Sequence, residues 1–222
     1  MKINIAIDGP GAAGKSTISK LLAKKFGYAY LDTGAMYRCC GYKAFIEGVD
    51  IEDEVALAKM MDEITIDFDS NNHVYLDGND VSEAIRTNEN GMRASKISQK
   101  AIVRSKLVDL QRKIAEGKGY ILDGRDIGTV VLPNAELKIY LVASVESRAN
   151  RRYKELLSKG LEADFDEISK DLIQRDYQDM NREVSPLKKA DDAIEVDTSD
   201  MSIEEVVNCL SSLYDKVIAE RK

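Results

Sequence analysis

Histidine is almost absent from this sequence of 222 residues, and His73 is the only one. It stands in a polar run at residues 70 to 73, between apolar segments at 64 to 68 and 74 to 76. This pattern predicts an exposed turn of a β-hairpin. Serine and cysteine triads and histidine-ligated zinc sites are therefore excluded, because each needs a histidine inside an active site.

Cysteine and long apolar runs are also scarce, and the 32 basic residues are outnumbered by 39 acidic ones. Cys39, Cys40 and Cys209 are an odd number without metal-type spacing, so we expect reduced, largely buried thiols. A net charge of −7 argues against a nucleic-acid polymer as partner, because such binding needs a basic face. No apolar run approaches the roughly 20 residues that span a bilayer. Residues 1 and 2 lead directly into a strand, which leaves no room for a signal segment. We expect a cytoplasmic monomer without a membrane partner.

A phosphate-binding pattern stands near the start of the chain. It matches G-x-x-x-x-G-K-[ST] and follows the apolar run at residues 3 to 7. We expect its glycines to take positive φ, Lys15 to reach the β and γ phosphates, and Ser16 to bind Mg²⁺. The alternative is a glycine-rich turn that only joins a strand to a helix, but such a turn does not need that lysine. The predicted triphosphate-binding residues are Gly9, Pro10, Gly11, Ala12, Ala13, Gly14, Lys15, Ser16 and Thr17.

Strands and helices are expected to alternate along most of the chain. The expected strands are 2 to 8, 28 to 31, 119 to 123, 137 to 141 and 193 to 196. The expected helices are 15 to 26, 34 to 47, 100 to 116, 145 to 159, 165 to 182 and 202 to 220. This order predicts an α/β fold of the P-loop NTPase type, with three α/β/α layers and a five-stranded parallel core sheet.

One segment breaks the alternation. Residues 49 to 88 carry a helix at 52 to 62 and the two-stranded hairpin, which predicts an inserted nucleotide-binding lobe. Gly160 and the polar residues after it separate two charged helices, which predicts a mobile helical lid. We therefore expect one kinase-like unit over 1–222, with the core at 1–48, 89–145 and 183–222, the insert at 49–88, and the lid at 146–182.

Several arginines stand where phosphate would bind. Arg125 and Asp126 follow the strand at 119 to 123, whose last residue, Asp123, is expected to hold Mg²⁺-bound water. Two helical sets each form one polar face by their spacing. Either face alone is typical of a solvated, salt-bridged surface, but two such faces beside a flexible turn favour a lid that closes on phosphates. The two sets are Arg148, Arg151 and Arg152, and Arg175, Asp179 and Arg182.

Four motifs in this order resemble those of bacterial cytidylate kinases, nearly from end to end. They are residues 9 to 16, 31 to 38 and 123 to 131, and the pairs Arg175-Asp176 and Asn181-Arg182. The resemblance implies direct in-line transfer of the γ phosphate of ATP, with Mg²⁺, to CMP or dCMP. A P-loop kinase for another monophosphate such as UMP, or for a hydroxylated acid, is the nearest alternative. A nucleotide-operated switch is a further one, although the chain lacks its usual Asn-Lys-x-Asp or Leu-Ser-Gly-Gly-Gln sequences.

The resemblance also implies a role for individual residues. Catalytic roles fall to Lys15, Arg125, Arg175 and Arg182, and Arg151 and Arg152 would meet ATP. Mg²⁺ would be held at Ser16 and Asp123. The CMP contacts would come from Thr33 near the pyrimidine, Tyr37 and Arg38 at the base and acceptor phosphate, Arg104 and Arg125 on that phosphate, Ser95 and Asp126 on the cytosine edge, and Arg175, Asp179 and Arg182 on the sugar and phosphates. Ser95 and Arg104 are expected on a single helix.

Overall fold

The computed structural model describes residues 1–69 and 71–221. The chain forms two compact units, of which unit 1 consists of residues 1–31 and 117–222, and unit 2 of residues 32–116. The boundary passes through the end of one strand, β2 (Ala29–Asp32). The expected insert at 49–88 lies wholly within unit 2, and the expected lid at 146–182 lies wholly within unit 1.

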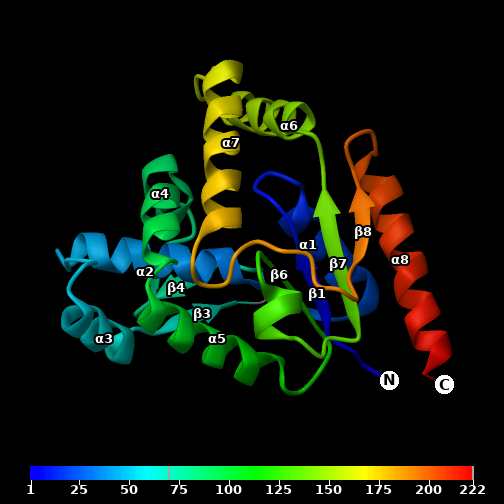
Figure 1. The fold of residues 1–222 in the computed structure, drawn as a ribbon, viewed down its shortest axis with the longest axis horizontal. Helices are drawn as coiled ribbons and strands as arrows, with labels where there is room; N and C mark the ends of the chain where they lie inside the picture. The colour runs from blue at the N-terminus through cyan, green and yellow to red at the C-terminus, as the bar shows by residue number, and fades with distance from the viewer. Residues whose placement is uncertain (70, 222) are drawn as a thin grey trace. The chain divides into compact units, whose positions relative to one another are not determined.

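Unit 1 is built on a five-stranded sheet with the strand order β2-β6-β1-β7-β8. Its other strands are β1 (Ile5–Asp8), β6 (Tyr120–Gly124), β7 (Leu137–Val142) and β8 (Ile194–Asp197). β1 runs parallel to both β6 and β7, and β8 runs parallel to β7. The predicted α/β fold with a five-stranded parallel core sheet and flanking helices is confirmed (Figure 1).

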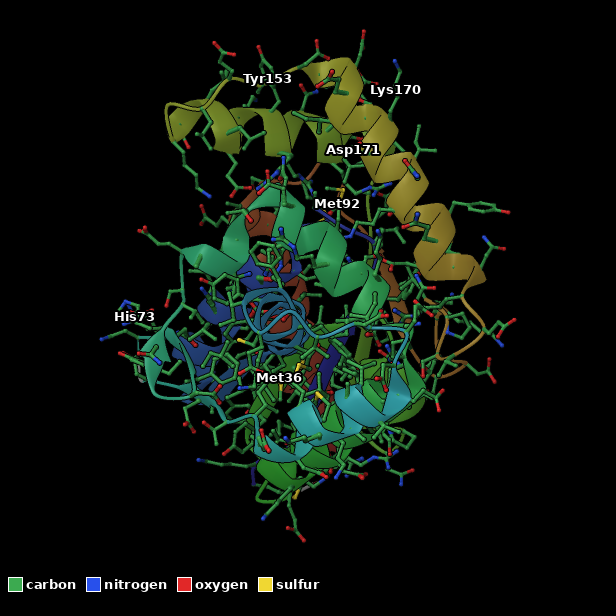
Figure 2. All side chains as sticks on the ribbon, turned by 90° about the vertical axis from the view of Figure 1, so that its left-hand side faces the viewer. Met36, His73, Met92, Tyr153, Lys170 and Asp171 are labelled. Atoms are coloured by element: carbon green, nitrogen blue, oxygen red, sulfur yellow. The ribbon has the colours of Figure 1, made fainter. Side chains whose placement is uncertain are left out.

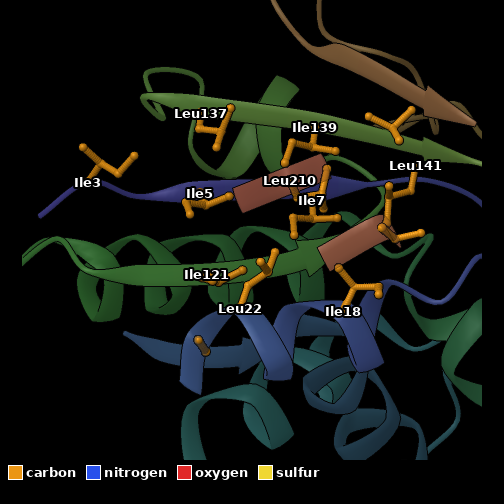
Figure 3. Packing of buried hydrophobic residues seen from close by; sticks show 13 residues of the cluster. Ile3, Ile5, Ile7, Ile18, Leu22, Ile121, Leu137, Ile139, Leu141 and Leu210 are labelled. Atoms are coloured by element: carbon orange, nitrogen blue, oxygen red, sulfur yellow. The ribbon is translucent and has the colours of Figure 1, made fainter. Parts of the chain in front are cut away.

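The core of unit 1 lies where α1 (Lys15–Phe26) and α8 (Ile203–Glu220) pack on the sheet. Ile18 and Leu22 of α1 are 3% and 1% exposed and meet the buried side chains of β1, β6 and β7 (Figure 3). Burying each such side chain contributes about 1.5–3 kcal/mol. At the start of α8, Ser202 Oγ accepts from the N–H of Glu205, whose carboxylate accepts from the Ser202 N–H. This capping box fixes the beginning of the helix that the sequence predicts.

The predicted lid segment of unit 1 contains two helices, α6 (Val145–Ser158) and α7 (Phe165–Asn181), which contact each other (Figure 1). Ser144 caps α6 through the N–H of Ser147, and Asp164 caps α7 through the N–H of Glu167. Gly160 follows α6 with φ of 71°, a conformation that suits glycine. The break between the two predicted helices therefore lies where the sequence places it.

Unit 2 holds four helices and a small antiparallel sheet among its described residues. They are α2 (Thr33–Ile46), α3 (Glu54–Glu63), α4 (Asn88–Ile97), α5 (Ala101–Ala115), the 3₁₀ turn η1 (Ala84–Arg86), and the sheet β3 (Ile66–Phe68), β4 (Val74–Leu76) and β5 (Asn79–Asp80). The expected hairpin exists, but β5 extends it to three strands. Helix α4 is absent from the sequence-based expectation. His73 lies between β3 and β4 and is exposed (Figure 2). It contacts Asp69, while residue 70 of the expected turn lies outside the described residues.

Two further expectations concern the whole chain. All three cysteines are free thiols, with Cys39 and Cys40 buried and Cys209 partly buried, as predicted. Within residues 1–69 and 71–221, no helix combines the length and the apolar character needed to cross a membrane.

Candidate phosphoryl-transfer site

The phosphate-binding loop joins β1 to α1, as its sequence predicts. Gly9 has φ of 149° and Gly14 has φ of 89°. A Cβ atom on Gly9 would collide with the carbonyl oxygen of Leu141 in β7, so only glycine fits at this turn. The expectation of positive φ at Gly11 is wrong, because the left-handed residue between the two glycines is Ala12, with φ of 58°. Thr17 is exposed on the first turn of α1.

Lys15 is 6% exposed and its Nζ donates to the carbonyl oxygen of Pro10 at 2.7 Å, across the loop. Burial, and after it the neighbouring Arg125, lower the pKa of Lys15 to about 7, although Asp123 and Asp8 act in the opposite direction. A cation held at this cost is stabilised by an anion, so the loop is electrostatically prepared for phosphate.

The two predicted Mg²⁺ ligands are hydrogen-bonded to each other. Ser16 Oγ donates to Asp123 Oδ2 at 2.7 Å, and Tyr30 Oη donates to Asp123 Oδ1 at 2.9 Å. Asp123 is 4% exposed at the end of β6, in register with Ile7 of β1. One hydroxyl and one carboxylate, completed by phosphate oxygens and water, are the hard oxygen ligands that Mg²⁺ takes. This donor set fits Mg²⁺, and no cluster of three or more acidic, histidine or cysteine ligands occurs in the part of the chain that the structure describes.

Asp8 is a site residue that the sequence analysis missed. It is the last residue of β1 and is 4% exposed. Its Oδ1 accepts from the N–H of Ile127 at 2.8 Å and its Oδ2 from the N–H of Gly128 at 2.7 Å. Burial raises the pKa of Asp8 to about 6, although the two N–H groups act to lower it. A carboxylate directly before the loop glycine was the only available signal in the sequence.

The acidic and basic residues after β6 and on α7 meet in unit 1. Arg125 Nε donates to Asp179 Oδ2 at 2.7 Å. Burial opposes the charge on Asp179, but Arg125 outweighs it and holds the pKa of this carboxyl below its usual range. Arg182 Nη2 lies 3.8 Å from Asp126 Oδ1, and both side chains are 6% exposed. Burial lowers the pKa of Arg175, and the adjacent Arg125 lowers it further.

The predicted lid arginines on α6 divide into two kinds. Arg148 is 4% exposed and donates to the carbonyl oxygens of Gly11 at 3.1 Å and Ala143 at 3.0 Å. Its guanidinium also pairs with Asp176 of α7 at 2.7 Å, so it ties α7 to the loop.

Arg151 and Arg152 stand on the same helix one turn further on. Arg151 donates to the Ala13 carbonyl oxygen at 3.3 Å and to both oxygens of Thr198. Arg152 pairs with Glu155 at 2.9 Å, and its side chain is 28% exposed. Arg151 therefore contacts the phosphate loop directly, whereas Arg152 lies nearer to solvent.

Unit 2 contains the other predicted substrate residues. Asp32 caps α2 by accepting from the N–H of Ala35 at 2.8 Å, and it pairs with Arg86 at 2.6 Å. Arg38 Nη1 donates to the carbonyl oxygen of Ile85 at 2.7 Å. The guanidinium of Arg104 lies 5.2 Å from the ring centre of Tyr37, a cation–π distance.

The expectation that Ser95 and Arg104 share one helix is wrong. Ser95 lies on α4, and Arg104 lies on α5, where its Nη1 donates to the Ser98 carbonyl oxygen at 3.1 Å. The Ser95 side chain is partly buried and Thr33, at the start of α2, is 3% exposed. Within unit 2 the structure thus brings Tyr37 and Arg104 together. The roles of the five substrate residues of unit 2 stay predictions; these residues are Thr33, Tyr37, Arg38, Ser95 and Arg104.

Comparison with known proteins gives a consistent family assignment. The family model described as cytidylate kinase matches residues 5–216. A cytidylate kinase of Bacillus cereus (strain ATCC 10987 / NRS 248) is 49% identical over 222 residues, covering 99% of each chain. One of Bacillus thuringiensis (strain Al Hakam) has the same identity and coverage. A crystal structure of an uncharacterized protein from Eubacterium ventriosum ATCC 27560 matches 97% of this chain and 99% of its own, with a TM-score of 0.53 and 15% identity, which shows a shared fold. The chain belongs to the cytidylate kinase family.

Proposed function

We propose that the protein transfers the γ phosphoryl group of ATP to CMP and dCMP, giving ADP with CDP or dCDP. The observation that carries the proposal is the arrangement in unit 1 of a phosphate loop, a Ser16–Asp123 pair and a buried arginine cluster around Asp179. Family membership supports cytosine as the base.

Charge neutralisation is the main task of the site, because phosphoryl transfer moves negative charge among oxygens. Lys15 and the N–H groups of the loop would hold the β and γ phosphates. Ser16 and Asp123 would hold Mg²⁺, which when bound bridges phosphate oxygens and offsets their charge. Arg125, held by Asp179, would present its remaining N–H groups to phosphate in a fixed orientation.

Arginine suits the remaining positions because its planar fork stays charged and grips phosphate through two hydrogen bonds. Burial lowers the pKa of Arg175, so this guanidinium would gain from an anionic neighbour. We assign Arg175 and Arg182 to the phosphates, with Asp179 at the sugar hydroxyls. Arg151 and Arg152 would hold the ATP phosphates from α6. No general base is required, since the attacking phosphate oxygen is already ionised at neutral pH.

Base selection would depend on Asp126. Its carboxylate is 6% exposed, and a buried acceptor that faces the cytosine amino group would face a carbonyl oxygen in uracil. Leaving such groups unpaired costs about 1–3 kcal/mol. In unit 2, Ser95 would read the cytosine edge and Thr33 would lie near the pyrimidine. Tyr37, Arg38 and Arg104 are assigned to the monophosphate and its base.

An acceptor panel tests the proposal. ADP release is measured with ATP and Mg²⁺ against CMP, dCMP, UMP and AMP, with Lys15→Met as the inactive control. We expect CMP and dCMP to be used well and the other two poorly. ATP hydrolysis that is independent of any acceptor would instead support a nucleotide switch. With a chiral γ-thiophosphate donor, a single in-line transfer predicts inversion at phosphorus, whereas a phospho-enzyme predicts retention.

Two properties of the protein outside the site complete the proposal. We propose that the protein acts as a monomer in the cytoplasm. Sedimentation at micromolar concentration tests the monomer.

A further inference from the structure

Asp8 caps a turn that belongs to another part of unit 1. The turn is η2 (Ile127–Val131), and its first two N–H groups each donate to one oxygen of the Asp8 carboxylate, at 2.8 and 2.7 Å. The first N–H groups of a helical turn have no acceptor inside the turn. Usually the residue just before the turn accepts, with its own side chain, from the N–H of the second or third residue of the turn. Here the cap comes from the neighbouring strand β1.

The usual capping position is occupied by Asp126, whose side chain does not cap η2. Its carboxylate instead lies 3.8 Å from the guanidinium of Arg182. An Asp126 side chain that capped the turn would bend back onto the N–H group of Gly128 or Thr129. Asp8 Oδ2 already accepts from the Gly128 N–H, so capping there would bring two carboxylates onto one donor.

The approach between Asp8 and the turn is close and rigid. A Cβ atom on Gly128 would lie 3.3 Å from Asp8 Oδ2 and 3.2 Å from a side-chain carbon of Lys138, so glycine permits the contact. Asp8 belongs to the central strand of the sheet and pairs by register with Gly124 of β6 and Tyr140 of β7. The backbone of Asp8 is thus held between two neighbouring strands, which fixes the position of the cap.

We propose that Asp8 is a positioning residue for nucleobase selection. By capping η2 from β1, it holds the Asp126 carboxylate in the orientation that accepts from the cytosine amino group. This inference rests on the proposed function, in which Asp126 reads the base. We assign Asp8 itself no contact with either nucleotide.

Asp8→Asn is the test variant. An asparagine has one acceptor oxygen and would turn its NH₂ group toward one of the two N–H donors, so half of the cap is lost. Glu136→Gln is the matched control, since Glu136 accepts from the N–H of Asn4 at the other end of β1. The milder Gly128→Ala pushes the turn away from Asp8 and keeps the test valid if Asp8→Asn fails to fold.

Two readouts decide the outcome. Asp8→Asn and Gly128→Ala should lower the ratio of kcat/KM for CMP over UMP by about tenfold, through KM for CMP, with little change in KM for ATP. Hydrogen exchange should quicken at Ile127 and Gly128. Glu136→Gln should change neither readout.

The failures are distinguishable. A wild-type protein without preference for CMP over UMP would defeat the proposed function itself. If the wild type prefers CMP and both variants keep its ratio, or lose activity equally on both acceptors, only the role of Asp8 is overturned. Unchanged exchange at Ile127 and Gly128 in Asp8→Asn would overturn the cap.

Discussion

Replacing Arg148 with methionine should destabilise the protein by about 3–5 kcal/mol, because a buried ion pair would lose one partner. The Arg148 side chain is 4% exposed and that of Asp176 is 13% exposed, and they meet at 2.7 Å. The carbonyl oxygens of Gly11 and Ala143 would also lose their donor. For a chain of this size, the loss corresponds to a fall of about 10 °C in the unfolding midpoint.

A double-mutant cycle isolates the pair. Asp176→Leu removes the other charge, and the double variant should lose less stability than the two single losses added together, because it leaves no unpaired buried charge. The carbonyl oxygens of Gly11 and Ala143 still lack their donor in the double variant. Arg152→Met is the control on the same helix. Its partner Glu155 is more exposed, at 45%, so the cost should stay below about 1 kcal/mol.

Urea unfolding followed by circular dichroism measures all four variants. We expect a coupling energy of about 2–3 kcal/mol between positions 148 and 176. The reasoning is refuted if the two single losses add to within about 0.5 kcal/mol, or if Arg148→Met costs no more than Arg152→Met. Either result would mean that the buried guanidinium is solvated in a way that the structure does not show.

Four further predictions concern the site. The pKa of Lys15 is about 7, so ATP binding above neutral pH should be accompanied by protonation of Lys15. The affinity for ATP should therefore fall as the pH rises above 7. Calorimetry in buffers of different ionisation heat measures the proton uptake. Asp126→Ala should strongly reduce kcat/KM for CMP and should change KM for ATP little. Equal losses of kcat/KM for CMP and UMP would count against the role of Asp126. Asp123→Asn should raise the Mg²⁺ concentration needed for half-maximal rate, with ADP release as the assay. The pKa of Asp8 is raised from 3.8 to about 6, so the folded protein favours the protonated side chain. The stability that this preference contributes is present below pH 4 and is lost as the pH rises to 6. Relative to Asp8→Asn, urea unfolding of the wild type should show a loss of about 3 kcal/mol across that window.

The sequence predicted those parts of the fold that follow from local pattern. The phosphate loop, the parallel strands and the helices α6 and α7 each carry a periodicity or a motif that few other structures satisfy. The sequence did not predict helix α4, because the segment is polar and contains Gly91 and two asparagines. Packing holds it in place, since a Cβ on Gly41 of α2 would lie 3.0 Å from the backbone of α4. Such a close helix contact is a tertiary effect that local propensity does not encode.

The candidate site was predicted less completely. Motifs identified the charged residues, and spacing predicted that Arg175, Asp179 and Arg182 share one helix face. Helix α7 ends at Asn181, however, and Arg182 follows it with an extended backbone. Which side chains pair could not be deduced, because pairing depends on how separate elements pack. The sequence predicts that Arg148 is a lid arginine. In the structure its guanidinium donates to the carbonyl oxygens of Gly11 and Ala143 and pairs with Asp176. The bond from Asp8 to residues more than a hundred positions away has no local signal.

Product analysis by ³¹P NMR tests the central claim most directly. ATP, Mg²⁺ and CMP are mixed with the wild-type protein and, in parallel, with Lys15→Met. The account predicts that ADP and CDP appear in equal amounts with the wild type, without inorganic phosphate, and that neither appears with the variant. Release of inorganic phosphate without CDP, or undiminished CDP formation by Lys15→Met, would contradict it.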